Sequence, residues 1–537
     1  RQKNPNAKIL ILDNHDDFGG HAKRNEFHSG GKMLLSFGGS INLEQDAMSP
    51  TAYGLLEEIG VDFKALQNAG AEDYSLSNGA APFGLYLGRS LYGEDQLAAG
   101  LWQYTWAGVG DFRAQINSLN LPDNDKAKLI SLASGEKDYI NDIPLADKEA
   151  FLRSTSYASF LYDRVGLSAA GARIAEPWSR AIFGVGIESI SIREAVALGA
   201  PGYNALGFPA EESETDAAEE EGAYRYPMFP DGNASVARLF VRKLIPEVAA
   251  GSSMQSLVTA RFDYSTLDRA NSAVRLRLNS TAVNVTHHGS VAKSDGVDVA
   301  YVSGDQAFTV RGKHCILAGY NGMIPHLCPE LPQAQKESLA YGVKTPFVWA
   351  NVLLRNGAAV RAEQSSVYQC PGSFFELVSH APPVALGSYQ PSGKANDPMV
   401  MFMGHVPAPY AKRQTNGAAK SDQSARDLYR LGRHKLFTAP FSEFETAISE
   451  QLTGMFGHNG FDAKRDIEAI TLNRWSHGYA YEYLDLHDPQ WAKGQAPHEL
   501  GRKPFGRISI ANSDSEAYAY VQAAIDAAVR AVGEVSE

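Results

Sequence analysis

The chain opens with a short apolar run that ends at an acid. Residues Ile9 to Leu12 are all aliphatic, Asp13 follows directly, and Gly19-Gly20 comes six residues later. A short apolar run bounded by turn residues is typical of a buried strand. The order of strand, acid, glycine pair and basic residues resembles the second strand of a nucleotide-binding βαβ unit.

A second group of patterned segments lies between residues 229 and 330. Apolar residues recur at helical spacing after a Pro-Asp-Gly turn, namely at Val236, Leu239, Phe240 and Leu244. This spacing predicts an amphipathic helix, capped by Asn233 or Ser235. Three later segments are strand-like: Val274 to Val285, Val297 to Val302 and Val310 to Ala318. They suit either the middle of a nucleotide-binding domain or a plain β-meander packed on a core.

The last forty residues form a third patterned segment. Arg507 to Ala511 is strand-like, and Ser513 to Glu516 has the S-x-x-E pattern of a helix capping box. Apolar residues then follow at helical spacing, at Val521, Ile525, Ala528 and Val532. The N-terminus of such a helix carries free N–H groups, which stabilise negative charge on a bound cofactor. The alternative is a plain C-terminal helix that docks for stability.

Strand-like and helix-like segments alternate along the chain, which predicts an α/β (α+β) fold. The three nucleotide-related pieces lie far apart in the sequence. We therefore expect a two-domain protein with a Rossmann-like domain assembled from residues 1–50, 229–340 and 495–537. Residues 51–228 and 341–494 are expected to form a mixed substrate-binding domain inserted between these pieces.

An aromatic stretch, Asn473 to Tyr483 (NRWSHGYAYEY), stands out near the end of the inserted domain. Alternate residues of a strand face the same side, so one face would carry Trp475, His477, Tyr479, Tyr481 and Tyr483. Aromatic walls hold amines through cation–π and apolar contacts. An aromatic-rich strand that simply packs a core is the alternative interpretation.

Composition narrows the function classes. The 537 residues carry a formal net charge of -12, which disfavours nucleic acid as a partner. An acidic surface suits a cationic substrate, or it only keeps the protein soluble. No apolar run approaches the length of a membrane span. The acid-rich segment 211–221 and the polar segment Lys412 to Arg426 are expected to be solvated loops.

The opening stretch predicts specific contacts to a nucleotide. An acid at the end of the second strand of a βαβ unit binds ribose hydroxyls, and Asp13 occupies that position. The glycine pairs Gly19-Gly20 and Gly38-Gly39 allow close approach of the backbone to a ligand. The glycine turn that normally holds the pyrophosphate would precede Arg1. Our hypothesis is that a cleaved N-terminal fragment carries this turn and stays bound.

Five stretches together resemble the FAD-dependent amine oxidoreductase family: LILDNHDDFGGHAKRNEF, FPDGNASVARLFVRKLIP, MIPHLCPELP, NRWSHGYAYEY and FGRISIANSDSEAYAY. The resemblance covers essentially the whole chain and is greatest to bacterial enzymes that dehydrogenate spermidine. It implies non-covalent FAD, a b-type haem, a polyamine substrate and an electron acceptor such as a cytochrome or quinone. It also implies a periplasmic location, with a cytoplasmic one left open.

The resemblance also assigns roles to individual residues. It places Asp13, Gly19, Gly20, Gly38 and Gly39 at the cofactor, together with His21, which stands where many amine oxidases have arginine. It places the Val283 backbone at adenine, and Ser513 and Asp514 at the flavin ring. Tyr479 takes the position of a cage tyrosine, with Trp475 and Tyr481 as further candidates.

Two assignments stay open beside these. Glu482 or a loop acid is expected to anchor a distal ammonium group of the substrate, and His326 or His477 is a candidate haem ligand. Another FAD-dependent amine oxidase or a desaturase would suit the same motifs. A non-catalytic binding protein on the same fold is the alternative from a different class.

Overall fold

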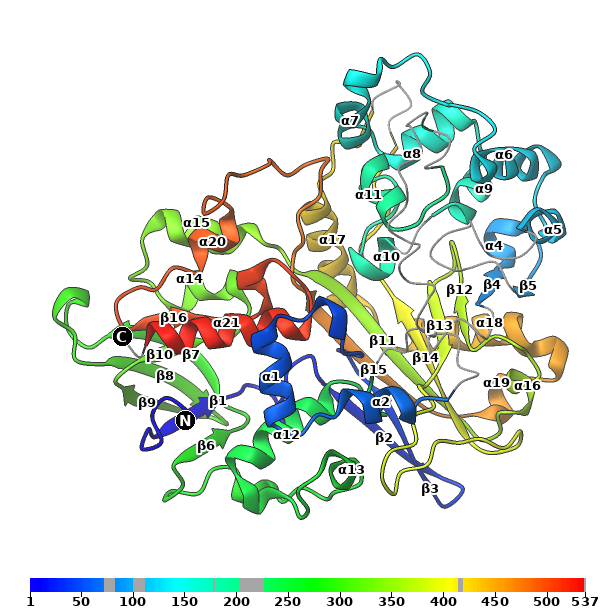
Figure 1. The fold of residues 1–537 in the computed structure, drawn as a ribbon. Coiled ribbons are helices and arrows are strands. Elements are labelled where there is room, and N and C mark those ends of the chain that lie inside the picture. Colours follow the sequence, from blue (N-terminus) through cyan, green and yellow to red (C-terminus); the bar gives the residue numbers. More distant parts are fainter. Residues whose placement is uncertain are drawn as a thin grey trace.

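The computed structural model describes residues 1–71, 83–99, 112–176, 179–202, 206, 227–413 and 419–535. The acid-rich segment 211–221 lies outside these residues, as do residues 414–418 of the polar segment. Helices and strands alternate along the chain, so the fold is mixed α and β, as expected. Figure 1 shows the strands gathered in two regions, with the helices α6 to α11 above the larger sheet.

The described strands form a seven-stranded sheet, a three-stranded meander and three two-stranded pairs. In chain order they are β1 Ile9–Leu12, β2 Arg24–Ser29, β3 Lys32–Phe37, β4 Gly84–Leu87, β5 Gln96–Ala99, β6 Val274–Arg277, β7 Thr281–His287, β8 Val297–Ser303, β9 Gln306–Gly312, β10 Cys315–Leu317, β11 Thr345–Leu354, β12 Val367–Gln369, β13 Leu377–His380, β14 Met399–His405, β15 Ile467–Tyr479 and β16 Ile508–Ile510.

The longer described helices are α1 Pro50–Glu58, α2 Phe63–Ala69, α5 Phe112–Ser118, α6 Asp123–Ser134, α7 Leu145–Ser154, α12 Ala234–Leu244, α15 Gln333–Tyr341, α17 Ala425–Thr438, α18 Phe441–Phe456 and α21 Val521–Glu534. The shorter ones are α4 Arg89–Tyr92, α8 Tyr157–Ser159, α9 Ala169–Ile174, α10 Ser179–Ile182, α11 Ile192–Ala197, α13 Met254–Leu257, α14 Ile324–Leu327, α16 Ala358–Arg361, α19 Ala463–Asp466 and α20 Pro497–Gly501. Across the parts of the chain that the structure describes, every helix is too short or too polar to cross a bilayer.

Two of the strand pairs are parallel and join distant parts of the sequence. β1 pairs with β6, with Ile9 opposite Val274, and β10 pairs with β16, with Cys315 opposite Ile508. The predicted strand at Ile9 to Leu12 is therefore confirmed, and Asp13 follows its carboxyl end. Parallel strands cannot be joined by a tight hairpin turn, so the chain crosses over between the two partners of each pair.

The predicted strand Val274 to Val285 is in fact two strands. β6 ends at Arg277 and β7 begins at Thr281, because Asn279 adopts a left-handed conformation with φ 50°. The N–H of Asn279 donates to the carbonyl of His15, and that of Ser280 donates to the carbonyl of Asp13. The turn therefore ties β6 to the loop after β1, while β7 continues into the antiparallel meander with β8 and β9.

The amphipathic helix predicted around Val236 is confirmed as α12, but the prediction that a side chain of Asn233 or Ser235 caps it is wrong. Asn233 is the N-cap residue by position, yet its side chain makes no capping bond. Its amide instead donates to Ser40 Oγ at 2.7 Å, which fixes the loop after β3. Ser235 lies within the helix and donates to Asp231. Both side chains are thus used for tertiary contacts.

The capping box predicted at Ser513 to Glu516 is also wrong. These residues form a short 3-10 turn, and α21 begins only at Val521, after Tyr520. The physical reason is that Asp514 is held by tertiary contacts: one of its oxygens accepts from Lys344 Nζ at 2.6 Å and the other from the Asn321 N–H at 3.0 Å. The N-terminus of α21 has no side-chain cap.

The seven-stranded sheet has the order β15-β11-β14-β13-β12-β4-β5. Strand β11, next to the edge strand β15, is buried along its whole length and pairs with β15 and β14 on its two sides. The helices α17 and α18 pack against one side of this sheet, where Phe444, Ile448 and Leu452 of α18 join its apolar core. The end of β15 points toward the parallel strand pairs and carries the aromatic stretch (Figure 1).

Candidate functional site

A cavity of about 2940 Å³ lies beyond the carboxyl ends of β1 and β10 and extends to the end of β15. Its walls come from segments that are distant in the sequence: the loop after β1, the start of α12, the loop after β16, the start of α21 and the last residues of β15. Ligands of open parallel sheets bind beyond the carboxyl ends of the strands. This position makes the cavity the candidate functional site.

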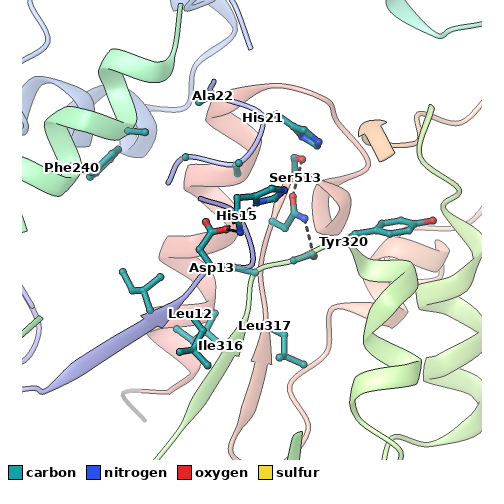
Figure 2. Close-up of a pocket in the computed structure, with 18 of the residues that line it drawn as sticks. Leu12, Asp13, His15, His21, Ala22, Phe240, Ile316, Leu317, Tyr320 and Ser513 are labelled. Atoms are coloured by element: carbon teal, nitrogen blue, oxygen red, sulfur yellow. Dashed lines mark hydrogen bonds and ion pairs between the residues drawn. The ribbon is translucent and has the colours of Figure 1, made fainter. Parts of the chain in front are cut away.

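Asp13 stands at the tip of β1 and faces the cavity, as Figure 2 shows. One of its oxygens accepts from the backbone N–H of His15 at 2.9 Å and contacts the His15 ring nitrogen Nδ1 at 3.0 Å. This hydrogen bond to Asp13 raises the pKa of His15 above its ordinary value, against the opposing effect of burial. The other carboxylate oxygen remains available for the hydroxyls of a ligand.

The two predicted glycine pairs differ in their surroundings. Gly19 and Gly20 line the cavity in left-handed conformations, with φ 102° and 57°. Gly39 also lines it, whereas Gly38 lies behind the wall and its carbonyl accepts from Trp475 Nε1 at 2.5 Å. The glycines thus bring the loop after β1 and the loop after β3 together at one wall.

Gly39 has no room for a side chain. A Cβ at this position would lie 2.0 Å from the backbone oxygen of His21, whereas a Cβ at Gly20 would meet nothing within 4 Å. We expect Gly39→Ala to lower the free energy of unfolding by about 3 kcal/mol through overpacking. Gly20→Ala is the matched control and should cost only about 1 kcal/mol, for its left-handed backbone. Urea denaturation of both variants checks this, and equal losses would contradict it.

Aromatic side chains form the end of the cavity nearest the large sheet. The Trp475 ring meets the His21 ring edge-on at 4.7 Å, and Tyr479 lies 4.3 Å from Phe347. Trp349 lines the same wall. Burial is the main cause that raises the pKa of Tyr479 above its ordinary value. The nearby charge of Glu482 raises this pKa further.

Tyr481 does not share this wall. The strand β15 ends at Tyr479, so the alternation that would have placed Tyr481 and Tyr483 on the same face stops there. Tyr481 is buried in the core and its hydroxyl bonds to Asp488, while the Tyr483 hydroxyl contacts His498 at 2.9 Å. Neither is among the residues that line the cavity.

Two carboxylates, Glu44 and Glu482, line the cavity beside these rings. Burial raises the pKa of Glu482 from 4.5 to about 7, and the neighbouring charge of Glu44 adds to this. Burial also raises the pKa of Glu44. Among the described residues, neither carboxylate forms an ion pair with lysine, arginine or histidine, and their charges repel each other. Such a pair favours a ligand that brings positive charge.

Lys344 is a cavity residue that the sequence patterns did not suggest. It directly precedes β11, is buried together with Asp514, and forms with it the ion pair described above. A lone lysine at the start of an otherwise apolar strand is the signal that would have identified it. Asp514 itself is not among the lining residues, because its carboxylate turns toward Lys344 and away from the cavity.

Two other predicted residues lie at the margins of the site. Ser513 lines the cavity and donates to Asn512 Oδ1, and Asn512 has a left-handed backbone with φ 89° and donates to the Gly319 carbonyl. Val283 is 47% exposed and lies outside the lining, although Thr281 and Ala282 beside it belong to it. Strand β7 therefore contributes Thr281 and Ala282 to the cavity wall, just before Val283, the residue predicted to contact adenine.

The candidate haem ligands do not suit that role. His477 lines the cavity, but its Nε2 contacts Arg433 at 2.9 Å and its Nδ1 contacts Ser476 at 2.9 Å, so both ring nitrogens are engaged. Burial, then Arg433, lowers its pKa to about 4. His326 is exposed on α14 and is not part of the cavity wall. Within the described ranges, no cluster of three or more His, Cys, Asp or Glu side chains could hold a metal ion.

Comparison of the sequence with protein-family models and with curated proteins finds no match. Solved structures match its fold. A putrescine oxidase variant aligns with 14% identity and a TM-score of 0.52, over 98% of this chain and 93% of that one. Cyclohexylamine oxidase from Brevibacterium oxydans aligns with 12% identity and a TM-score of 0.52, over 99% of both chains. The chain has the fold of FAD-dependent amine oxidases.

In this two-domain α/β flavoprotein fold, the cavity has two parts. One part lies at the tips of the parallel strands, beside Asp13 and the glycines. The other lies at the end of β15, beside the aromatic rings and the two carboxylates. A wild-type putrescine oxidase bound to putrescine has the same fold, with 14% identity and a TM-score of 0.51 over 98% of this chain and 93% of that one.

Proposed function

We propose that this protein is a flavin-dependent amine oxidoreductase whose substrate is a polyamine such as spermidine. The observation that carries the proposal is the union of two features in one cavity. Asp13, at the tip of a parallel strand, opens onto the same space as an aromatic wall that carries two half-buried carboxylates, Glu44 and Glu482. A polyamine suits this wall because it combines apolar methylene segments with positive charges.

The cavity has groups that fit FAD. Asp13 would bind the ribose hydroxyls, and the left-handed turn at Gly19 and Gly20 would let the backbone approach an extended ligand. The uncapped N-terminus of α21, at Val521, faces the cavity and favours negative charge on a ring system held there. FAD would accept a hydride from a carbon next to the amine nitrogen. The helix start at Val521 thereby takes the role that we predicted for the Ser513–Asp514 turn.

The protein's own residues would prepare the amine. Trp475 and Tyr479 would offer an aromatic surface, and desolvation against it would lower the pKa of an amine that enters the site. The neutral amine then has the lone pair that hydride loss requires. Glu482, supported by Glu44, would hold a second, charged nitrogen at a distance, so that the chain of the substrate is oriented along the wall. Water would hydrolyse the released imine to an aldehyde and a shorter amine.

Several finer predictions rest on the resemblance alone. A dehydrogenase that passes electrons to a cytochrome or quinone is our proposal over an oxidase. The two candidate ligands, His326 and His477, do not fit haem, so we derive no step through it, and a periplasmic location stays a prediction. Turnover of spermidine with a quinone acceptor, compared with oxygen uptake, tests the choice. Rapid oxygen uptake that a quinone does not increase would contradict a dehydrogenase.

The role of Asp13 can be tested by Asp13→Asn, which keeps the size of the side chain and removes its charge. We expect the affinity for FAD to fall about tenfold, because hydrogen bonds to a charged acceptor are lost. The pKa of His15 should fall toward its ordinary value in the same variant, since Asp13 raises it. Fluorescence titration with FAD and NMR titration of His15 measure the two effects.

Asp16→Asn is the matched control, because the Asp16 side chain is exposed and lies three residues further along the same loop. It should leave the affinity for FAD unchanged. An Asp13→Asn protein in which the pKa of His15 falls while the affinity for FAD does not change would remove Asp13 from the cofactor site.

A further inference from the structure

A second, smaller cavity adjoins the aromatic end of the main one. It measures about 60 Å³, and its walls come from α10 and from the strands β11, β13 and β14 of the large sheet, among other segments. Ala181, Trp349 and Leu377 line both cavities, so the two meet at these residues. A ligand held on the aromatic wall of the main cavity would have this smaller cavity, which we name the side pocket, within its reach.

The side pocket carries a buried guanidinium group beside two carboxylates. Arg180 donates from Nε to Glu376 at 2.9 Å and from Nη2 to the Val406 carbonyl at 2.8 Å. Glu176 also lines the pocket and accepts from Arg173 Nη1 at 3.2 Å. Burial raises the pKa of both Glu176 and Glu376, against the attraction of the neighbouring arginines. The pocket therefore offers charges of both signs in a desolvated space.

One nitrogen of the Arg180 guanidinium group has no acceptor. Within the described chain its Nη1 is buried and makes no hydrogen bond, and the residue is only 6% exposed. Buried donors in folded proteins are rarely left unpaired, because the hydrogen bond that they lose to water is then not replaced. Arg180 Nη1 thus points to an acceptor that comes from outside the chain.

The mixture of charges selects the kind of group that fits the side pocket. An ammonium group would bind the carboxylates, but it would leave Arg180 Nη1 unpaired and would lie beside a positive charge. A carboxylate would meet the like charges of Glu176 and Glu376. A carboxamide suits both sides, because its carbonyl accepts from a guanidinium and its N–H donates to a carboxylate. About 60 Å³ holds about four to six groups the size of a water molecule, which is the size of an acetamide group.

We propose that the side pocket binds the amide end of an N-acylated polyamine, with the amide carbonyl on Arg180 Nη1 and the amide N–H on Glu176 or Glu376. The methyl of an acetyl group would pack against Phe347 and Val406, which also line the pocket. The amide is bound and is not cleaved, since oxidation takes place at an amine in the main cavity. The inference rests on the proposed function for this reaction and on the side pocket for its selectivity.

Gly404 allows the side pocket to be filled without removing these charges. It lies on β14, opposite Trp349 of β11 and Leu377 of β13, and lines the pocket. A Cβ at this position would be 3.5 Å from the Trp349 ring and 3.6 Å from the Leu377 Cβ, which are ordinary contact distances. Gly404→Ala therefore adds a methyl group to the pocket with no clash. Substitution of Arg180 would instead leave Glu376 without its partner and would destabilise the fold.

The first test compares spermidine with spermidine acetylated at either primary nitrogen, in steady-state kinetics with FAD-loaded protein. We expect kcat/KM for at least one acetylated form to be about tenfold above that for spermidine, and Gly404→Ala to lower this ratio about tenfold. Gly457→Ala is the matched control, because Gly457 lines neither cavity and its Cβ would meet Thr453 at 3.7 Å. It should leave the ratio unchanged. A ratio that Gly404→Ala does not lower would overturn the proposal, and a larger loss for spermidine would assign the pocket to an ammonium group instead.

Binding without turnover separates this inference from the proposed function. Isothermal titration uses N-butylacetamide, butylamine and pentanoate as probes, with protein to which FAD has been added and then reduced by dithionite, so that no probe is oxidised. We expect the amide to bind about tenfold more tightly than the amine or the carboxylate, and Gly404→Ala to remove this preference. No preference for the amide, or one that Gly404→Ala keeps, would overturn the proposal even if spermidine reduces the flavin. A preference that Gly404→Ala removes, in a protein whose flavin no amine reduces, would support the side pocket and count against the proposed function.

Discussion

Lys344→Met is expected to lower the free energy of unfolding by about 3–5 kcal/mol, because it breaks a buried ion pair and leaves Asp514 charged in the interior. Urea denaturation of the wild-type protein and the variant measures this. A loss of less than about 1 kcal/mol would show that the fold does not depend on this ion pair.

Two further variants control this prediction. Lys344→Met combined with Asp514→Leu removes both charges and should recover much of the lost stability, since apolar replacement of both partners is often neutral. Lys148→Met removes another buried lysine, which pairs with Asp138 at 3.0 Å far from the cavity. It should also destabilise the fold but should leave the binding of flavin unchanged, whereas Lys344→Met should weaken it.

Glu482→Gln is expected to lower kcat/KM for spermidine or putrescine by about 30-fold or more, because it removes one partner of a desolvated charge pair. The same change should hardly affect a simple monoamine, which has no second ammonium group to bind. Steady-state kinetics with both substrate types measures the difference. Glu443→Gln, at an exposed position of α18, is the control and should change neither. Equal losses for diamine and monoamine would remove Glu482 from the distal ammonium site.

The pH dependence of the same residue gives a second readout. Burial, with the charge of Glu44, raises the pKa of Glu482 to about 7, so the carboxylate that binds an ammonium forms only as the pH rises through that value. We expect kcat/KM for a diamine to rise with pH around 7, and this limb to be absent in Glu482→Gln. The free energy of unfolding should change in the opposite direction. Between pH 4.5 and 7 the folded protein keeps the Glu482 proton while the unfolded chain loses it, so the contribution of Glu482 to stability falls as the pH rises.

Patterns of apolar residues in the sequence predicted the strand and the helix that carry parts of the site. The apolar run before Asp13 folds as β1, and the spacing around Val236 folds as α12. The cap predictions failed at Asn233 and at Ser513, in each case because a contact from a distant segment takes precedence over the local bond. Tyr481 was misplaced because nothing in its alternating pattern marks the end of β15 at Tyr479.

Other features had no local signal. Glu44 lies in a loop and meets Glu482 only through the fold, and the two parallel strand pairs at the cavity, β1–β6 and β10–β16, join segments that are far apart in the sequence.

The most direct test of a flavin-dependent amine oxidoreductase is an absorption spectrum of the purified protein, incubated with FAD and titrated with spermidine under anaerobic conditions. We predict a bound-flavin band in the visible region that bleaches as spermidine is added and returns when an electron acceptor is supplied. A protein that binds no FAD, or whose bound flavin is not bleached by any amine tested, would contradict the proposed function.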